Sequence, residues 1–332
     1  MRLIIKQIIM TKRIFPQEIK DAYLNIKGDI LKTPLEYSPK LSKISGAQVF
    51  LKMEHMQHTG SFKLRGVLNK IKSLHKDDFQ KTFIAASTGN HAAAFAFASK
   101  AFSFNGVLFM PENISDVKKD ALKEYDVKQY LYGKSSMETE AKATSYAKET
   151  GSILIHPYND PEIIKGQGTI GVEIQDQLPE VDTVLGPVGG GGLISGLCSF
   201  FDDDKVKVIG CQPVNASEMY ESVKSGKIVP PSTLSTIADA TAGGIEANSI
   251  TFDICKNQLN GFELINEKEI KEAVAFIVQN HQTIIEPGAA LPVAALLHSK
   301  KYVGRNVVLV LTGKKINHAL LTNIIDSYGN NY

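Results

Sequence analysis

The sequence is poor in cysteine, has no long apolar run and carries almost no net charge. Its three cysteines, Cys198, Cys211 and Cys255, lie far apart with no CxxC pair. This excludes a disulfide scaffold and the usual zinc spacing, and it favours a reducing, cytoplasmic setting. No apolar run approaches the ~18 residues of a membrane span. Lys and Arg number 37 and Asp and Glu 35, so no field of one sign favours nucleic acid or an anionic membrane as a partner.

What is present is the composition of a globular enzyme of about two domains. Of the 332 residues, 43% are hydrophobic and 22% are charged, which excludes a disordered or collagen-like chain. The N-terminal MRLIIKQIIMTKR does not fit a signal peptide, because Lys6 and Gln7 interrupt its apolar stretch. Lys12 and Arg13 then stand where a small-residue cleavage site is required. We expect this segment to lie outside the fold, with Met10 as an alternative start.

Short apolar runs alternate with segments of helical periodicity along most of the chain. The runs are almost continuously apolar, as in parallel strands that are covered on both faces. The alternation predicts a doubly wound α/β architecture that binds ligands at the carboxyl ends of its strands. The predicted strands are 49–51, 83–86, 107–110, 153–155, 181–185, 206–210 and 307–313. The predicted helices include 90–100, 115–125, 136–149, 161–177, 215–226 and 267–280.

The order of these elements predicts two domains. The stretch from about 83 to 157 is long enough for a small open sheet of four strands with three helices between them. We therefore predict a small domain of residues 53–157 inserted in a large domain of residues 1–52 and 158–332. The cleft between two such domains is a favoured ligand site.

The strongest local signal is GPVGGGGLISG, at residues 186–196. Gly189, Gly190, Gly191 and Gly192 follow an expected strand and precede an apolar segment suited to a helix. Without Cβ atoms the backbone N–H groups can converge, and the helix N-terminus adds positive potential, so the loop suits a phosphate. A flexible linker is the alternative, but linkers are rich in polar residues and this run lies between apolar segments.

The glycine spacing excludes two common nucleotide sites. Counted from Gly189 and Gly191, the last position of a GxGxxG motif is Ile194, and no GK[ST] follows to make a Walker motif. We therefore expect a ligand with one phosphate. A nicotinamide oxidoreductase is the weakest alternative.

A lysine in HTGSFKLRG, at residues 58–66, is a candidate for Schiff-base chemistry. Lys63 lies beside Phe62, behind a Ser/Gly turn and at the start of an expected helix. Desolvation and the positive end of a helix both favour the neutral amine that a Schiff base requires. On these residues alone, an exposed lysine is the commoner outcome.

A third group of polar residues stands at the start of an Ala-rich helix. Ser87, Thr88, Gly89 and Asn90 follow the strand FIAA, and His91 comes next. A helix N-cap needs only one such side chain, whereas the free N–H groups of a helix start can also bind a carboxylate. These residues alone leave both interpretations open, and His91 suits packing or capping better than catalysis. A lysine, a loop for one phosphate and a carboxylate loop are together what a pyridoxal phosphate enzyme acting on an amino acid needs.

Over about residues 30–325 the chain resembles the fold-type II pyridoxal phosphate enzymes, in particular the serine/threonine dehydratase and serine racemase family. The resemblance rests on TPLEYSPKLS, KMEHMQHTGSFKLRG, STGNHAAA, YNDPEIIKGQGTIGVEI, PVGGGGLISG and STIADA, in this order. It implies a homodimer with two open sheets and pyridoxal 5'-phosphate in the cleft. It assigns Lys63, next to Phe62, as the Schiff-base lysine and places Asn90 at the cofactor's 3'-oxygen. It also places the substrate carboxylate at residues 87–91.

Two segments depart from the family's pattern near the cofactor. Thr312 stands where the family has a Ser whose hydroxyl faces the pyridine nitrogen, and Lys314 and Lys315 replace the Gly-Asn pair that follows. Thr88 stands where dehydratases have Ala and racemases have Ser.

A third departure concerns the divalent cation of racemase-like members. In CQPVNASEMY, Gln212 replaces the first carboxylate of that site and leaves Glu218 as the only one. The sequence therefore argues against a metal site.

The resemblance implies a dehydratase, an ammonia-lyase that converts L-serine, L-threonine or a related β-hydroxy amino acid to a 2-oxo acid and ammonia. Lys63 is expected to remove the α-proton, and the uncharged hydroxyl of Thr312 to favour elimination. An amino acid racemase is one alternative, in which Thr88 supplies the second acid/base rather than a helix cap. A β-replacement synthase of the same fold is another. From a different class, a non-catalytic protein that binds a phosphate ligand stays open.

Overall fold

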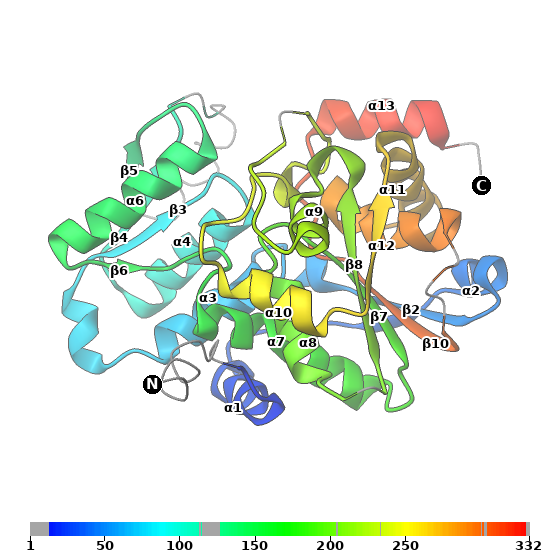
Figure 1. Ribbon diagram of the computed structural model, residues 1–332, viewed down its shortest axis with the longest axis horizontal. Coiled ribbons are helices and arrows are strands. Elements are labelled where there is room, and N and C mark those ends of the chain that lie inside the picture. Colours follow the sequence, from blue (N-terminus) through cyan, green and yellow to red (C-terminus); the bar gives the residue numbers. More distant parts are fainter. Residues whose placement is uncertain are drawn as a thin grey trace, which may run out of the picture.

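The structure, a computed structural model, describes residues 13–112, 114, 127–203, 205–232, 234–299, 301 and 304–329. Within these residues the chain forms two open sheets, each with helices on both faces (Figure 1). This confirms the predicted α/β architecture. The N-terminal segment up to residue 12 and the expected helix at 115–125 lie outside the described residues.

The smaller sheet consists of parallel strands in the order β5-β4-β3-β6. Its strands are β3 (Phe83–Ala86), β4 (Gly106–Met110), β5 (Lys128–Leu131) and β6 (Ile153–Leu154). The helices that pack on it are α3 (Lys63–Lys72), α4 (Asn90–Phe102) and α6 (Ser136–Thr150). Alternate side chains face opposite sides, as a pleated strand requires. Ile84 and Phe109 pack with α6, whereas Phe83 and Leu108 pack with α3 and α4.

The larger sheet has the order β1-β2-β10-β7-β8-β9 and is parallel except for β1, which pairs antiparallel with β2. Its strands are β1 (Leu35–Tyr37), β2 (Gln48–Lys52), β7 (Thr183–Pro187), β8 (Lys207–Pro213), β9 (Gly261–Ile265) and β10 (Asn306–Val310). The remaining α-helices are α1 (Pro16–Ile26), α2 (Pro39–Ser45), α7 (Pro161–Gln177), α8 (Gly192–Phe200), α9 (Glu218–Ser225), α10 (Ile250–Gln258), α11 (Glu267–His281), α12 (Pro287–His298) and α13 (His318–Tyr328). Short 3-10 turns are η2 (Glu54–Met56), η3 (Lys76–Gln80), η4 (Val214–Ala216) and η5 (Asp239–Thr241).

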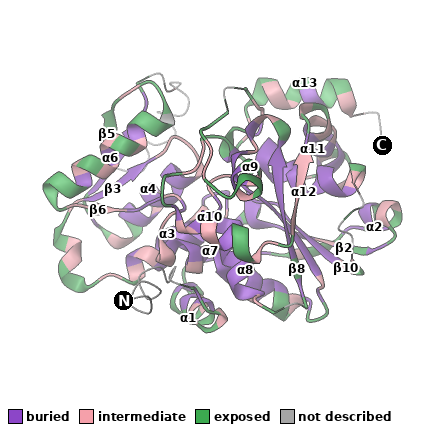
Figure 2. Cartoon of the chain, viewed as in Figure 1, coloured by how far each residue is buried: buried purple, intermediate pink, exposed green. Residues whose placement is uncertain are grey.

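The larger sheet is buried between two layers of helices. On β10, Val307 and Leu309 pack with α11 and α12, while Val308 and Val310 pack with α7 and α8. Figure 2 shows strands that are buried beneath helices with exposed outer faces. The near-continuous apolar runs in the sequence follow from this coverage on both faces.

Every predicted strand is present, with ends that shift by a few residues, and the strands that the sequence analysis missed share one property. β1, β5 and β9 each lie at the edge of a sheet. β5, with the sequence KQYL, has no fully buried residue. An edge strand is covered less completely, so it lacks the apolar run by which a central strand is identified.

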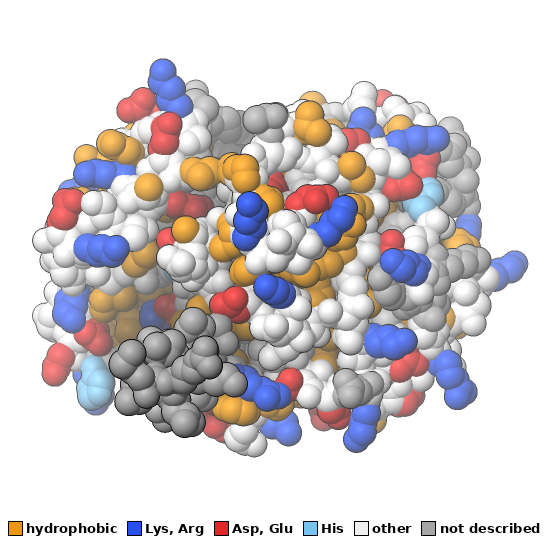
Figure 3. All heavy atoms as spheres, in the orientation of Figure 1, with side chains coloured by type: hydrophobic (Ala, Val, Ile, Leu, Met, Phe, Trp, Pro, Cys, Tyr) orange, Lys and Arg blue, Asp and Glu red, His pale blue; other side chains and the backbone are white. Residues whose placement is uncertain are grey.

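The division of the strands between the two sheets matches the two domains predicted above. The strands of the smaller sheet all lie within 53–157, and those of the larger sheet lie outside this range. The boundaries themselves stay a prediction. Charged side chains of both signs are interspersed over the face in Figure 3, in keeping with the balanced composition. In the described part of the chain, no helix is long and apolar enough to cross a membrane.

A buried ion network fixes α3 against α7. Arg65 donates to both oxygens of Glu54 at 2.7 Å and to both oxygens of Glu173 at 2.8 and 2.9 Å. Lys52 Nζ donates to Glu173 Oε2 at 2.6 Å, and the side chains of all four residues are fully buried. Because Arg65 follows Lys63 by two residues, the network sets the position of the helix start that carries this lysine.

Arg65→Met is expected to destabilise the fold strongly. It leaves the carboxylates of Glu54 and Glu173 short of a buried positive charge, and breaking a buried pair in this way costs about 3–5 kcal/mol. Urea denaturation should show a much lower midpoint. Lys81→Met is the control, because the contact of Lys81 with Asp78 is at the surface and its loss should leave the midpoint unchanged. An unchanged midpoint in Arg65→Met would contradict the role given to the network.

Candidate active site

A pocket of about 1000 Å³ lies where the carboxyl ends of strands from both sheets approach each other. The segments that follow β3, β7 and β10 contribute to its wall, as expected for an open parallel sheet. All the site residues predicted from the sequence line this pocket: Phe62, Lys63, Ser87, Thr88, Gly89, Asn90, His91, Gly189, Gly190, Gly191, Gly192 and Thr312.

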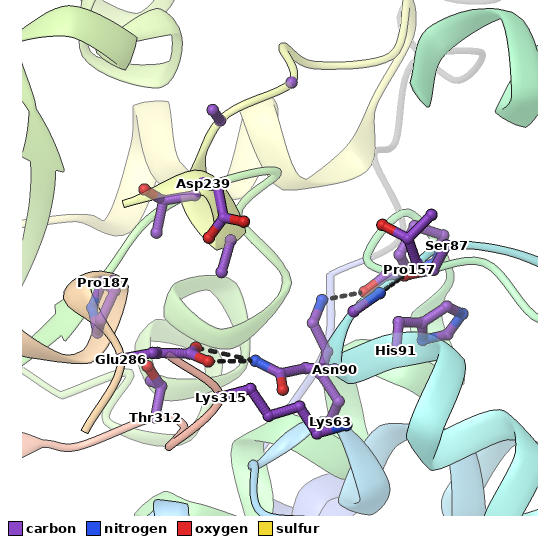
Figure 4. Close-up of a pocket in the computed structure, with 18 of the residues that line it drawn as sticks. Lys63, Ser87, Asn90, His91, Pro157, Pro187, Asp239, Glu286, Thr312 and Lys315 are labelled. Carbon is purple, nitrogen blue, oxygen red and sulfur yellow. Dashed lines mark hydrogen bonds between the residues drawn. The ribbon is translucent and has the colours of Figure 1, made fainter. Parts of the chain in front are cut away.

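Lys63 is the first residue of α3, and its amine points into the pocket (Figure 4). Its Nζ donates to the carbonyl oxygen of Pro157 at 2.8 Å and lies 5.3 Å from the centre of the Phe62 ring. Desolvation lowers the pKa of Lys63 to about 8, although the charges of Glu140 and Glu286 oppose the shift. The amine is therefore protonated for the most part near pH 7, but far less completely than an ordinary lysine, and its neutral fraction can act as a nucleophile or base.

The four glycines form a tight loop between β7 and α8. Gly191 has φ +88°, a conformation that favours glycine, and it is the N-cap of α8. A Cβ atom on Gly190 would lie 2.4 Å from Tyr158 Cδ1, and one on Gly191 would lie 2.7 Å from Met219 Cε. The loop therefore has no room for side chains, and the N–H groups at the start of α8 make it suitable for an anion.

The loop between β3 and α4 presents polar groups to the pocket. Gly89 is the N-cap of α4, and no side chain caps this helix. Ser87 Oγ accepts from Gly89 N at 3.2 Å. The hydroxyl of Thr88 therefore does not cap α4. The N–H groups at the start of α4 are available to a carboxylate.

Asn90 and His91, at the start of α4, make different contacts. Asn90 Nδ2 donates to both carboxylate oxygens of Glu286, at 2.8 and 2.9 Å, and its buried Oδ1 has no partner among the described residues. His91 Nε2 contacts the carbonyl oxygen of Ile155 at 2.8 Å. Burial and the neighbouring Lys63 lower the pKa of His91 to about 3, so its ring is neutral. The part that His91 plays in the site stays a prediction.

Sequence reasoning missed several acidic and basic groups of the pocket. Burial raises the pKa of Glu286 to about 7, although the hydrogen bond from Asn90 opposes the shift. Burial likewise raises the pKa of Glu140 and lowers that of Lys315. Glu286 precedes the proline at the start of α12 in the run IIEPGAALP. The proline at this helix start is the one feature of the sequence that could have pointed to Glu286.

The comparisons with known proteins agree with this geometry. Residues 26–313 match the family described as pyridoxal-phosphate dependent enzyme. This chain belongs to that family.

Relatives in this family share most of the chain's length. It is 35% identical to L-threonine ammonia-lyase of Thermotoga maritima, with 93% of this chain and 78% of the relative covered. It is 38% identical to a catabolic L-threonine dehydratase of Staphylococcus aureus, with coverage of 93% and 91%. The crystal structure of serine racemase from Dictyostelium discoideum superposes with a TM-score of 0.84 at 31% identity, covering 92% of this chain and 99% of that one.

The residues present fit the pyridoxal phosphate of this family. The glycine loop packs so closely on Thr241, Tyr158 and Met219 that it accepts no Cβ, which leaves its backbone N–H groups free to approach a phosphate. The lowered pKa of Lys63 suits a Schiff base. The buried, unpartnered Oδ1 of Asn90 and the buried Thr312 lie on the wall of the same pocket.

The residues at the position of the racemase-like metal site do not fit a divalent cation. Gln212 Nε2 donates to the carbonyl oxygen of Ala216 at 3.3 Å, and its Oε1 accepts from Tyr220 N at 2.8 Å. Glu218 Oε1 accepts from Ser232 N at 2.8 Å. The side chain of Gln212 thus presents an amide N–H to this segment where a cation would need a negatively charged oxygen. Among the described residues, no group of three or more metal-ligating side chains is found.

Proposed function

We propose that this chain is a pyridoxal-phosphate-dependent ammonia-lyase that converts L-threonine or L-serine to a 2-oxo acid and ammonia. The names of the relatives with 35–38% identity support this substrate class. The observation that carries the proposal is the position of Lys63, whose amine faces the same pocket as the glycine loop and the start of α4.

When bound, the cofactor supplies an aldehyde for the substrate amine and a ring that withdraws electrons from the α-carbon. The N–H groups at the start of α4, with Ser87 and Asn90, bind the substrate carboxylate. Lys63, once its amine is free, removes the α-proton. Lys63, which then carries a proton, would return it to the β-hydroxyl, which leaves as water, and the resulting enamine would hydrolyse to the 2-oxo acid and ammonia.

Thr312 supports elimination over transamination. It follows the end of β10 and lines the pocket with a hydroxyl rather than a carboxylate. A hydroxyl carries no charge that would stabilise a protonated ring nitrogen, so charge on the α-carbon is less stabilised and early loss of the β-hydroxyl is favoured.

The direct test is a product assay on the purified holoenzyme. L-serine, L-threonine and their D-enantiomers are supplied separately, and 2-oxo acid and ammonia are measured. We expect equal amounts of both products from an L-substrate. Formation of a new amino acid from O-acetylserine and sulfide, without 2-oxo acid from either L-substrate, would indicate a β-replacement synthase instead. No reaction with any of these compounds would favour a protein that only binds a phosphate ligand.

Thr88 favours a weak racemase activity beside the lyase. Racemisation needs an acid/base on each face of the α-carbon, and Lys63 serves only one. The hydroxyl of Thr88 does not cap α4, but its methyl restricts χ1 and occupies space. Thr88→Ala is expected to abolish D-serine formation from L-serine and largely spare 2-oxo acid formation, and Thr88→Ser should raise D-serine formation. If the parent forms no D-serine, or Thr88→Ala forms as much as the parent, Thr88 has no such role.

We also propose that the enzyme is a cytoplasmic homodimer. All three cysteines are free and buried, which suits a reducing compartment. Sedimentation of the holoenzyme tests the oligomeric state.

A further inference from the structure

Glu246 lies in the loop between η5 and α10 and contacts the segment 155–159 that leads from β6 to α7. Its Oε2 accepts from Asn159 Nδ2 at 2.7 Å and lies 3.2 Å from His156 Nε2. Its backbone N–H donates to the hydroxyl of Tyr158 at 2.9 Å. Glu246 thus contacts His156, Tyr158 and Asn159 directly, although it lies about 90 positions further along the sequence.

His156 links Glu246 to the backbone around Pro157. The backbone N–H groups of Tyr158 and Asn159 donate to His156 Nδ1 at 3.2 and 2.8 Å. Because Nδ1 accepts, the ring proton of the neutral histidine is on Nε2, which then donates to Glu246. Glu246 therefore sets the orientation of a ring that in turn holds two backbone N–H groups.

This segment contacts both Lys63 and the glycine loop, on which the proposed reaction depends most. Pro157, between His156 and Tyr158, offers its carbonyl oxygen to Lys63 Nζ at 2.8 Å (Figure 4). Tyr158 packs on the glycine loop: a Cβ atom on Gly190 would lie 2.4 Å from its ring, and one on Gly192 would lie 3.0 Å from its Cβ.

Other contacts hold the two ends of the segment: Ile155 N donates to Ile84 O at 2.7 Å, and Asn159 Oδ1 accepts from Ile250 N at 3.0 Å. Between these ends, the side chain of His156 is the one that holds the backbone next to Pro157. Residues 155–160 belong to no helix or strand, and proline has no N–H with which to anchor itself. Lysine has a long side chain with many rotamers, so a free amine needs a fixed acceptor to stay at one position.

The ionisable groups around Glu246 come from several elements. His156 and Lys148 are its basic neighbours, and Glu140 is the acidic one. The hydrogen bond from His156 is the main cause that lowers the pKa of Glu246 to about 2. The carboxylate is therefore charged at any pH at which the enzyme is assayed.

We propose that Glu246 is a positioning residue: through His156 it fixes the Pro157 carbonyl that holds the free amine of Lys63. This rests on the proposed function, because the amine is free only during turnover or without cofactor. The side chain of Glu246 does not itself line the pocket, so it acts on Lys63 and not on the substrate.

The first test separates positioning from substrate binding. In Glu246→Ala, kcat should fall about 10-fold, the loss expected when one charged hydrogen bond is removed, and KM should stay within about 2-fold. Glu246→Gln keeps the size and one acceptor oxygen and should give a smaller loss. Glu272→Gln is the matched control, because Glu272 contacts His298 Nε2 at 3.1 Å outside the pocket; it should leave kcat unchanged.

The second test uses cofactor-free protein and needs no turnover. Competitive labelling with acetic anhydride, followed by peptide mapping, measures the reactivity of each lysine. Glu246→Ala should change the reactivity of Lys63 several-fold relative to the surface lysines, and Glu272→Gln should not. His156→Asn should have a similar effect, and the double variant with Glu246→Ala should add little to either.

The positioning role of Glu246 and the lyase function can fail independently in these experiments. If the parent shows no lyase activity but the labelling of Lys63 changes as described, the positioning role stands and the function is wrong. If Lys63 labelling and kcat are both unchanged in Glu246→Ala, the positioning role is overturned whatever the activity. Additive effects of Glu246→Ala and His156→Asn would also overturn it, because the two residues would then act separately.

Discussion

Replacement of Lys63 by alanine is expected to lower turnover by a factor on the order of 10³ or more, because one amine serves as both nucleophile and base. The pocket offers this amine at the start of α3 with a pKa of about 8. The glycine loop and Asn90 are untouched, so the variant should still bind the cofactor, now without a covalent bond. Absorbance spectra and equilibrium dialysis measure the two effects separately.

The identity of the lysine is decided by trapping. Borohydride reduction of the holoenzyme and peptide mapping should place the label on Lys63. Lys315 is the sharpest competitor, because it lines the same pocket and burial lowers its pKa as well. Lys315→Ala should keep the label on Lys63, and a label found on Lys315 in the parent would overturn the mechanism.

Gly190→Val is expected to weaken cofactor binding by about 100-fold or more, equivalent to ~3 kcal/mol. The added Cβ would lie 2.4 Å from Tyr158 Cδ1, so the ring or the loop must move, and the backbone N–H groups that are expected to bind the phosphate are displaced. Titration of the cofactor-free protein with pyridoxal phosphate measures the dissociation constant.

Gly28→Val is the control for this change. No atom lies within 4 Å of a Cβ built on Gly28, and its φ is not in the left-handed region. Its cofactor affinity should equal that of the parent. A folded Gly190→Val protein with unchanged affinity would show that the phosphate binds elsewhere.

Much of the fold could be predicted because its central strands are covered on both faces. The runs at 83–86 and 307–313 are apolar for this reason, and both are central strands in the structure. β1 and β9 lie at the two edges of the larger sheet, where partial exposure permits polar residues such as Glu36 and Glu263. Their sequences therefore carry no comparable signal.

The site residues that could be predicted from the sequence are those whose local motif determines the local backbone conformation. A run of glycines between a strand and an apolar helix indicates a loop whose backbone N–H groups bind an anion, rather than a polar linker. The polar residues before α4 indicate a helix start. The partners of these residues were not predictable. Asn90 is hydrogen-bonded to Glu286, which lies 196 positions further along the chain.

The sequence by itself determined the α/β class and the pyridoxal phosphate cofactor, because these depend on short motifs whose conformation is set by neighbours in the chain. The residues that carry the chemistry stay a prediction. Only the tertiary structure decided that Glu286 contacts Asn90, that the Pro157 carbonyl accepts from Lys63, and that Glu246 contacts His156. Those contacts join loops that are brought together by the packing of two sheets. A hydrogen bond requires a donor and an acceptor within about 3 Å, a condition that sequence separation does not encode.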